Sequence, residues 1–282
     1  MRVIAHGVRG SVPAPGPDTA RYGGNTSCVE VNLMDGTRLV LDAGTGLREL
    51  GKQMAPGPTK VHLLLSHTHW DHVLGLPFFI PLWRKETEIV VYPLASEAQE
   101  RFRKTITLFD EIHFPVGVDD IPASFDFVKP EGSVWQIGSA QVSRIKLNHP
   151  GGSQGFRIVD ADGSSVAYLT DNELALPAPG GGSDDELVRF ADEVDLLIHD
   201  AQYLPADMPA KVGWGHSVVD DVLELARRAR PTKLLLFHHD PDRTDTELDA
   251  IRDASRSWLK DQNVACELDI ATEGVVHTLP PR

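Results

Sequence analysis

The stretch LLLSHTHWDHVLGLPFF (Leu63 to Phe79) places three histidines and an aspartate within six residues, between two apolar runs. Burying an unpaired imidazole or carboxylate costs on the order of several kcal/mol. Side chains two residues apart in an extended chain project to one face, so His67 and His69 can reach one cation. Asp71 and His72, on the turn that follows, can face a second cation. We interpret the stretch as a metal-binding motif and not an exposed polar turn, because imidazole and carboxylate suit zinc, manganese or iron.

One short motif does not complete two metal sites, so further ligands are expected where other strands end. His149 follows the strand pattern RIKLN, Asp171 follows VAYLT and His238 follows KLLLF. Active sites of α/β proteins gather at the C-terminal ends of such strands. With the first motif these residues supply seven ligands, enough for two ions with Asp171 as the bridge. His239 adjoins His238 and stays open as the alternative for the last position.

The composition is that of an ordinary globular protein, with 282 residues, 41% hydrophobic and 24% charged. The apolar runs are too short for a membrane span, and the first ten residues lack the apolar core of a signal peptide. Two cysteines, Cys28 and Cys266, cannot form a disulfide framework. We therefore expect one domain over residues 1–282, in a reducing cytoplasmic setting and without a membrane partner.

The net charge is −14, from 27 basic against 41 acidic residues. Binding of extended nucleic acid needs a basic surface that displaces counterions from phosphates, and no cluster of lysine or arginine indicates one. The charge balance predicts a small-molecule substrate.

Strand and helix patterns alternate along the chain, and two stretches of consecutive strands resemble antiparallel meanders. This order predicts an α/β protein of two sheets between helical layers, an αββα four-layer sandwich, with one doubly wound sheet as the alternative. The predicted strands are Val3–His6, Ser27–Leu33, Arg38–Leu41, Val61–Leu65, Val134–Ile137, Gln141–Lys146, Phe156–Val159, Val166–Thr170, 194–200, 233–237 and a closing pair within 265–279. The predicted helices are 44–54, Glu97–Phe109, one that begins at Ser217 with Asp220 in a capping box, and Glu247–Lys260.

Four further motifs accompany HTHWDH in chain order. They are GVRGSVPAP (Gly7 to Pro15), GGNTSCVEV (Gly23 to Val31), HDAQY (His199 to Tyr203) and GWGHS (Gly213 to Ser217). This set resembles the metallo-β-lactamase superfamily, and within it the branch of ribonuclease Z and the phosphoribosyl cyclic phosphodiesterases. The resemblance runs over nearly the whole chain. It implies the αββα fold, a hydrolase with two divalent metal ions, zinc first with manganese or iron as alternatives, and a homodimer.

The chain departs from that branch in several places. Asp200 stands where the branch has a glutamate, Gln202 where it has a threonine, and Val218 follows the GHS motif. No long insertion resembles the arm with which ribonuclease Z holds tRNA, and the two cysteines do not provide an additional structural zinc site. The identity of the substrate is therefore not carried over from the branch.

The expected chemistry is hydrolysis of a phosphodiester by a hydroxide that bridges the two cations. Asp71, His216 and Asp200 are the predicted catalytic residues: His216 protonates the leaving oxygen and Asp200 orients its imidazole. A lactonase or thioesterase on the same site is one alternative, although acyl-cleaving relatives do not need the added histidine. A non-catalytic metal-bound sensor is the other, and the complete ligand set argues against it.

Other conspicuous residues receive structural interpretations. His6 and His62 are expected in the core or on a sheet face, and Trp70 in packing. Asp42 could orient a ligand histidine or cap a helix. His113 lies in a proline-broken stretch that could cover the site, either solvated or lining the pocket.

Overall fold

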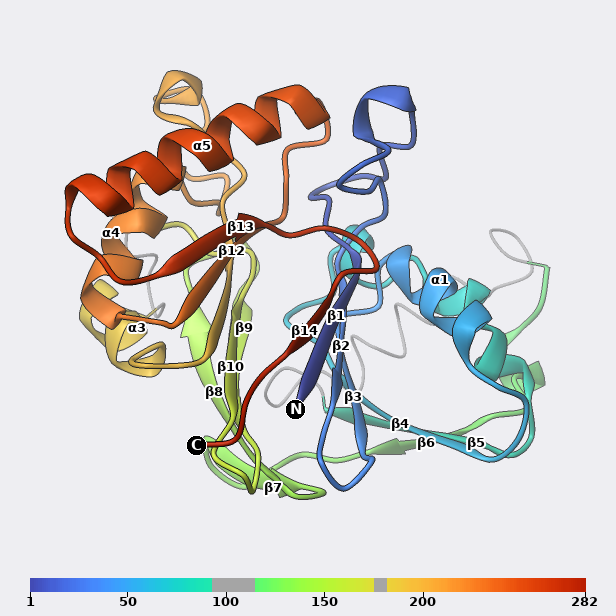
Figure 1. Cartoon of the computed structure of the whole chain (residues 1–282). Helices are drawn as coiled ribbons and strands as arrows, with labels where there is room; N and C mark the ends of the chain where they lie inside the picture. The colour runs from blue at the N-terminus through green and yellow to red at the C-terminus, as the bar shows by residue number, and fades with distance from the viewer. Residues whose placement is uncertain (93–114, 175–181) are drawn as a thin grey trace.

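The chain folds into two β-sheets that face each other, with helices on the outer face of each sheet (Figure 1). The computed structural model describes residues 1–92, 115–174 and 182–282. Within these residues each sheet has seven strands. The predicted αββα sandwich is confirmed, and the alternative of a single doubly wound sheet is wrong. No helix in the described ranges is long and apolar enough to cross a membrane.

The first sheet combines an antiparallel and a parallel part. Its strands, in sheet order, are β14 (Val276–Thr278), β1 (Arg2–Gly7), β2 (Cys28–Asn32), β3 (Arg38–Leu41), β4 (Thr59–Leu64), β5 (Thr87–Tyr92) and β6 (Ser124–Phe127). β14 and β1 to β3 pair antiparallel, whereas β3 to β6 pair parallel. The parallel part leads β4 directly into the HTHWDH motif.

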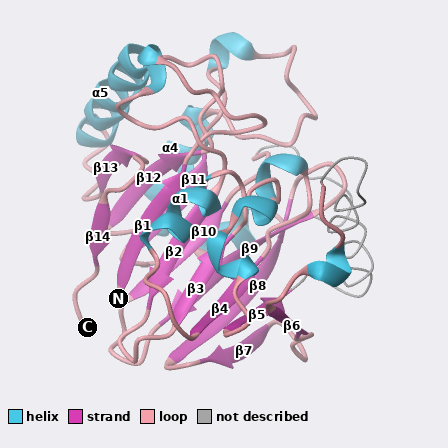
Figure 2. Ribbon diagram, turned by 90° about the vertical axis from the view of Figure 1, so that its right-hand side faces the viewer, coloured by secondary structure: helices cyan, strands magenta, loops and turns pink. Residues whose placement is uncertain are grey.

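The second sheet repeats this division. Its strands, in sheet order, are β13 (Glu267–Ile270), β12 (Lys233–Phe237), β11 (Leu196–Asp200), β10 (Ser165–Leu169), β9 (Ser153–Val159), β8 (Ala140–Leu147) and β7 (Val134–Ile137). β7 to β10 form the predicted antiparallel meander, and β10 to β13 are parallel. Loops from both sheets gather at the end of the sandwich away from the chain termini (Figure 2).

Three apolar clusters hold the four layers together. The central one lies between the sheets and combines residues such as Leu41 of β3 with Phe156 of β9 and Phe237 of β12. A second packs the outer face of the second sheet against α3 (Asp184–Phe190), α4 (Val219–Ala229) and α5 (Asp245–Asp261). The third packs α1 (Gly46–Gln53) on the first sheet. These clusters cover both faces of each sheet, which explains the apolar run LLL in the strands VHLLL and KLLLF.

Two sequence predictions are corrected by the structure. The helix predicted to begin at Ser217 is capped by Val218, and no side-chain capping bond forms. Ser217 Oγ instead donates to the carbonyl oxygen of Asn172 at 2.5 Å, so a partner from another strand end replaces the local capping box. The two closing strands do not pair with each other, since β13 joins β12 and β14 joins β1.

Some strands were not predicted, and some predictions fall outside the residues that the structure describes. β5 and β6 were not predicted, although TEIVVY and SFDF fit strand composition. The predicted helix Glu97–Phe109 and His113 lie outside the described residues. Trp70 was predicted to pack, but 71% of its surface is exposed.

Candidate metal centre

All seven predicted ligands lie where strands end, at the same end of the sandwich. Those from the first motif follow β4, with Asp71 and His72 inside a single 3-10 turn. His149, Asp171 and His238 follow β8, β10 and β12. Asp171 (φ 53°) and His238 (φ 60°) adopt the left-handed backbone conformation, which turns the chain sharply out of each strand. The ligand-type side chains therefore converge although the strands belong to different sheets.

The first group of ligand-type side chains consists of His67, His69, His149 and Asp171, whose candidate ligand atoms lie within 4.8 Å of one another. The Nε2 atoms of His67 and His149 each lie 3.6 Å from Asp171 Oδ2. His149 Nε2 lies 3.0 Å from His69 Nδ1. Three imidazoles and one carboxylate oxygen thus surround one position.

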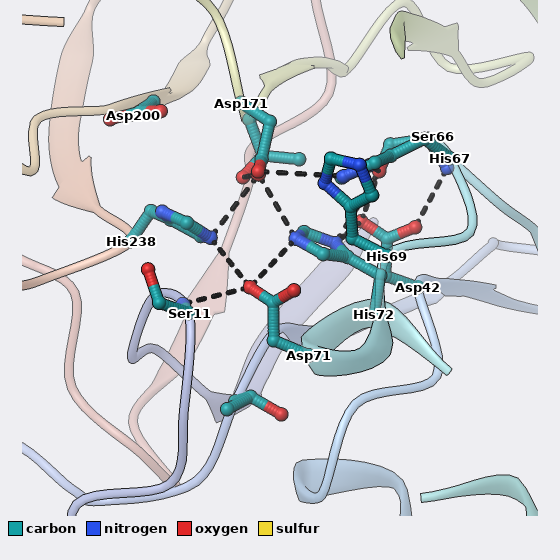
Figure 3. A network of polar contacts seen from close by, with 12 residues as sticks. Ser11, Asp42, Ser66, His67, His69, Asp71, His72, Asp171, Asp200 and His238 are labelled. Atoms are coloured by element: carbon teal, nitrogen blue, oxygen red, sulfur yellow. Dashed lines mark hydrogen bonds and ion pairs between the residues drawn. The ribbon is translucent and has the colours of Figure 1, made fainter. Parts of the chain in front are cut away.

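The second group consists of Asp71, His72, Asp171 and His238, with the same 4.8 Å limit between candidate ligand atoms. The other carboxylate oxygen of Asp171, Oδ1, lies 3.0 Å from His72 Nε2 and 3.2 Å from His238 Nε2. Asp71 Oδ2 lies 3.2 Å from each of the same two nitrogens. Figure 3 shows Asp171 and Asp71 on opposite sides of the His72 and His238 rings. Asp171 therefore offers one oxygen to each group, the arrangement expected of a bridging carboxylate.

The outward ring nitrogens of the histidines are held by fixed partners. Asp42 Oδ2 accepts a hydrogen bond from His72 Nδ1 at 2.9 Å and also from the hydroxyls of Ser66 and Tyr168. Asp42 is therefore placed to orient a ligand histidine, the first of its two interpretations, and it does not cap a helix since Thr45 is the residue before α1. Such an outer carboxylate fixes the imidazole tautomer and strengthens its metal-facing nitrogen.

Two further histidines are oriented by neutral acceptors. His149 Nδ1 donates to the carbonyl oxygen of Gly215 at 2.9 Å, and His238 Nδ1 donates to Gln202 Oε1 at 3.0 Å. Each bond leaves the Nε2 lone pair directed inward. Gln202, at the position where the sequence departs from the branch, thus contacts a predicted ligand.

The residues fit a pair of divalent cations. Among the described residues, the buried Nε2 atoms of His67 and His72 have no hydrogen-bond partner. Because His72 donates to Asp42 through Nδ1, its Nε2 lone pair faces carboxylate oxygens of Asp71 and Asp171. Lone pairs and carboxylates at these distances repel unless a positive charge lies among them. Imidazole and carboxylate are the ligands that zinc, manganese and iron share.

The local electrostatics favours the metal-binding forms of these groups. Burial lowers the pKa values of His67, His69 and His149, so their imidazoles are neutral. Burial opposes ionisation of Asp171, but the charges of His238 and His72 outweigh it and hold the pKa well below its usual range.

His72 shows the need for a cation most directly. Burial disfavours its charged form, yet the carboxylates of Asp171, Asp71 and Asp42 outweigh this and raise the pKa of His72 well above its usual value. The same reasoning holds for Asp71: burial raises its pKa, while the positive charge of His72 and the contact with His238 Nε2 lower it below the usual range. The pocket therefore favours a positive charge among these side chains.

A second polar pair lies beside the two groups. His216 Nδ1 donates to Asp200 Oδ2 at 2.7 Å, and the His216 ring stacks on His238 with 4.9 Å between centroids. Burial lowers the pKa of His216, but the charge and hydrogen bond of Asp200 prevail and raise it to about 9. His216 precedes the capping residue Val218 by two positions, so it lies next to the helix start but not in its first turn.

His238 and His239, the two candidates for the seventh ligand, have different surroundings in the structure. His238 belongs to the second group, whereas His239 Nε2 donates to the carbonyl oxygen of Ala271 at 2.9 Å. Burial lowers the pKa of His239 to about 3, which keeps it neutral in that structural position.

Sequence reasoning missed two residues that hold the site together. The backbone N–H of Ser11 donates to Asp71 Oδ2 at 2.8 Å, and the GVRGS motif was the available signal. The Glu173 carboxylate, 5% exposed, accepts from the backbone N–H groups of Gly213 and Gly215 at 2.8 and 2.9 Å. No sequence signal marked Glu173, because its partners lie forty residues further along the chain.

Two facing sheets between helices, with paired His/Asp groups at one end, define the metallo-β-lactamase class of fold. The chain belongs to the beta-lactamase superfamily, since the family model of the Beta-lactamase superfamily domain matches residues 37–239. That range contains all seven predicted ligands together with Asp200 and His216.

Known relatives agree with the predicted branch. An uncharacterized protein of Mycobacterium leprae is 27% identical over 99% of this chain and 86% of its own length. A ribonuclease Z of Natronomonas pharaonis is 23% identical over 84% of this chain and 86% of its own length. The structure of a diphosphatase from the PhnP family matches with a TM-score of 0.67 at 19% identity, covering 99% of this chain and 98% of that one. The prediction of a metallo-β-lactamase-fold hydrolase in the ribonuclease Z and PhnP branch is confirmed.

Proposed function

We propose that the chain is a dinuclear metal-dependent phosphodiesterase that cleaves a small or cyclic phosphodiester. The observation that carries the proposal is Asp171, whose two carboxylate oxygens face two different ligand groups. The hydrogen-bonded pair of His216 and Asp200 lies directly beside them. A centre that only stored or sensed metal would have no use for this second pair.

The residues that would hold the cations divide into two sets that share Asp171. They are His67, His69 and His149 in one set, and Asp71, His72 and His238 in the other. When bound, divalent cations supply Lewis acidity toward a phosphoryl oxygen and make water a usable nucleophile near neutral pH. The chain keeps its ligands in place through the bonds from Asp42, Gly215 and Gln202 to their outer nitrogens.

His216 is the residue that would protonate the leaving oxygen. Its Nδ1 is engaged by Asp200, so the proton for transfer is carried on Nε2, the free ring nitrogen. The pKa of about 9 keeps this imidazole protonated at neutral pH. A positioned acid of this kind matters for an alkoxide that leaves poorly and little for a phenolate that leaves without a proton.

The proposed substrate is small and not an extended nucleic acid. The net charge of −14 would repel a polyanion, since several basic contacts are normally needed to hold tRNA at cellular salt. The ribonuclease Z of Natronomonas pharaonis acts on RNA by its name, yet this chain lacks a basic arm in its sequence. The PhnP-family protein is a diphosphatase by its name, which supports phosphorus as the centre that is attacked.

Metal analysis followed by a substrate panel tests the proposal. We expect close to two divalent ions per chain, matching the two groups, and chelation should abolish activity that zinc or manganese restores. The panel holds a cyclic phosphodiester, an aryl phosphodiester, a lactone, a thioester and precursor tRNA. Hydrolysis restricted to the two diesters supports the proposal. Preference for the lactone or thioester, salt-sensitive cleavage of tRNA, or metal binding without hydrolysis would each contradict it.

A further inference from the structure

Lys211 has no carboxylate partner among the described residues, although the protein is strongly acidic. Its ammonium lies 4.2 Å from the ring centroid of Trp214 and 5.4 Å from that of Tyr203. Lys52, in contrast, is neutralised by Glu49 at 2.8 Å. Aromatic faces hold an ammonium in place but do not cancel its charge. Lys211 therefore presents an available positive charge.

Lys211 is linked to the metal centre by a row of packed rings. The His216 ring lies 4.9 Å from His238 and 5.3 Å from His149, both predicted ligands. On another side, Tyr203 packs edge-on against His216, with 5.7 Å between centroids. Lys211 lies over that same Tyr203 ring. The ammonium is thus the next charged group beyond His216 along this row.

The turn that supports Lys211 is rigidly attached to the centre. Glu173 accepts hydrogen bonds from the backbone on both sides of Trp214, at Gly213 and Gly215. Trp214 is 56% exposed, so apolar burial does not account for its position, and these backbone bonds hold it. Tyr203 is buried. Both aromatic faces that hold the ammonium are therefore fixed relative to Asp171, two residues before Glu173.

We propose that Lys211 binds a second negatively charged group, a phosphate or a carboxylate, on the leaving side of the phosphodiester substrate. This inference rests on the proposed function, in which His216 protonates the leaving oxygen. The leaving group must then extend from the centre on the side of His216, where Tyr203 and Lys211 follow. Since the surrounding protein is acidic, an unpaired ammonium there selects an anionic leaving group over a neutral one.

Three ethyl aryl phosphodiesters test this specificity. Their phenol leaving groups have matched pKa values and carry either no charged substituent, a carboxylate or a phosphate. We expect the wild-type protein to prefer one or both charged esters in kcat/KM by about tenfold, the equivalent of one charge-assisted hydrogen bond. The two charged esters distinguish a carboxylate from a phosphate. The preference should shrink as ionic strength rises, because the ammonium is partly exposed.

Variants identify the group responsible. Lys211→Met should lower kcat/KM for the preferred charged ester about tenfold more than for the neutral ester, whereas Lys211→Arg should retain the preference. Lys52→Met, which removes a remote lysine paired with Glu49, is the matched control and should change neither value. An equal loss on all three esters would make Lys211 a structural residue and overturn the inference. Equal wild-type rates on all three would overturn it while leaving the proposed function intact. Hydrolysis of none of them would overturn both.

Discussion

The carbonyl oxygen of Gly215 accepts a hydrogen bond from Nδ1 of His149 at 2.9 Å, which joins the turn carrying His216 to the first ligand group. Gly215 has φ +88°, and a Cβ at this position would lie 2.2 Å from His149 Nδ1. The same turn therefore orients a predicted ligand through its backbone and the predicted proton donor through its side chain.

Gly215→Ala tests this relationship. We expect lower affinity for the metal of the first group, because the added methyl group must displace the His149 ring, and the positive φ adds strain. Loss of an orienting partner typically costs about 10- to 100-fold in metal affinity. Competition with a chelator of known affinity measures the change. Gly213→Ala, also at positive φ but with open space around its Cβ, is the control. Equal affinity in both variants would contradict the assigned role of Gly215.

Glu173→Gln tests the hydrogen bonds that hold the same turn, residues 213–216, at its backbone. An amide cannot accept from both Gly213 and Gly215 as the carboxylate does, so the turn should shift and misplace His216. A displacement of about 1 Å lowers kcat by up to about 10²-fold, and the loss should be larger for poor leaving groups. Glu273→Gln, which weakens a comparable carboxylate–backbone bond at Asn25, serves as the control for simple destabilisation. A rate loss that is independent of the leaving group would show that Glu173 is only structural.

Asp42→Asn should weaken the second metal position. Asp42 accepts from His72 Nδ1 and is fully buried, so the amide removes the charge that strengthens His72 as a ligand. The expected loss in metal affinity at the second group is about 10- to 100-fold. Asp195, a buried carboxylate that accepts from Ser165, provides the control. Asp195→Asn should lower the melting temperature without changing metal affinity. If both variants bind metal as the wild type does, Asp42 has no influence on the site.

The variants His238→Ala and His239→Ala, compared with each other, test which of the two histidines is the seventh metal ligand. The first should reduce bound metal from close to two ions per chain toward one, because His238 faces both Asp71 and Asp171. The second should retain both ions and lower the free energy of unfolding, since it removes the bond to Ala271 and leaves a cavity. Elemental analysis and thermal unfolding separate the two effects. Loss of metal only in His239→Ala would reverse the assignment.

The convergence of the ligand-type residues was predictable because it follows from strand ends. His149, Asp171 and His238 follow β8, β10 and β12, which run in the same direction and therefore end at one edge of the second sheet. The choice between His238 and His239 was not predictable. It depends on the left-handed conformation of His238, which sends one side chain into the site and the next toward Ala271.

Contacts between loops that are distant in the chain could not be predicted from the sequence for a related reason. Ser217 resembled a capping residue in its local sequence. Its hydroxyl instead donates a hydrogen bond to the carbonyl oxygen of Asn172, which lies just after the end of β10. Glu173 and Gln202 likewise have roles only because the turn 213–216 and the end of β12 lie against them. Local patterns predict elements and their ends, whereas these pairings exist only once both sheets are assembled.

His216 is the residue whose role is most sharply testable. Its Nδ1 bond to Asp200 and its pKa of about 9 favour a protonated imidazole next to the ligand groups. His216→Asn should therefore keep both metal ions but lower kcat on an alkyl phosphodiester by about 10²–10⁴-fold, the usual contribution of a positioned acid. The loss should be much smaller on a nitrophenyl ester, because nitrophenolate departs without a proton.

The same measurements distinguish the other roles of this residue. His199, also buried but bonded to the Asp200 carbonyl and the Asn172 side chain, is the matched histidine. His199→Asn should lower stability and reduce the rates on both esters equally. Metal loss in His216→Asn would make His216 a ligand, in keeping with its position in a third group with Asp200 and His238. An unchanged kcat on the alkyl ester, with full metal content, would leave His216 with a packing role against His238 and Tyr203.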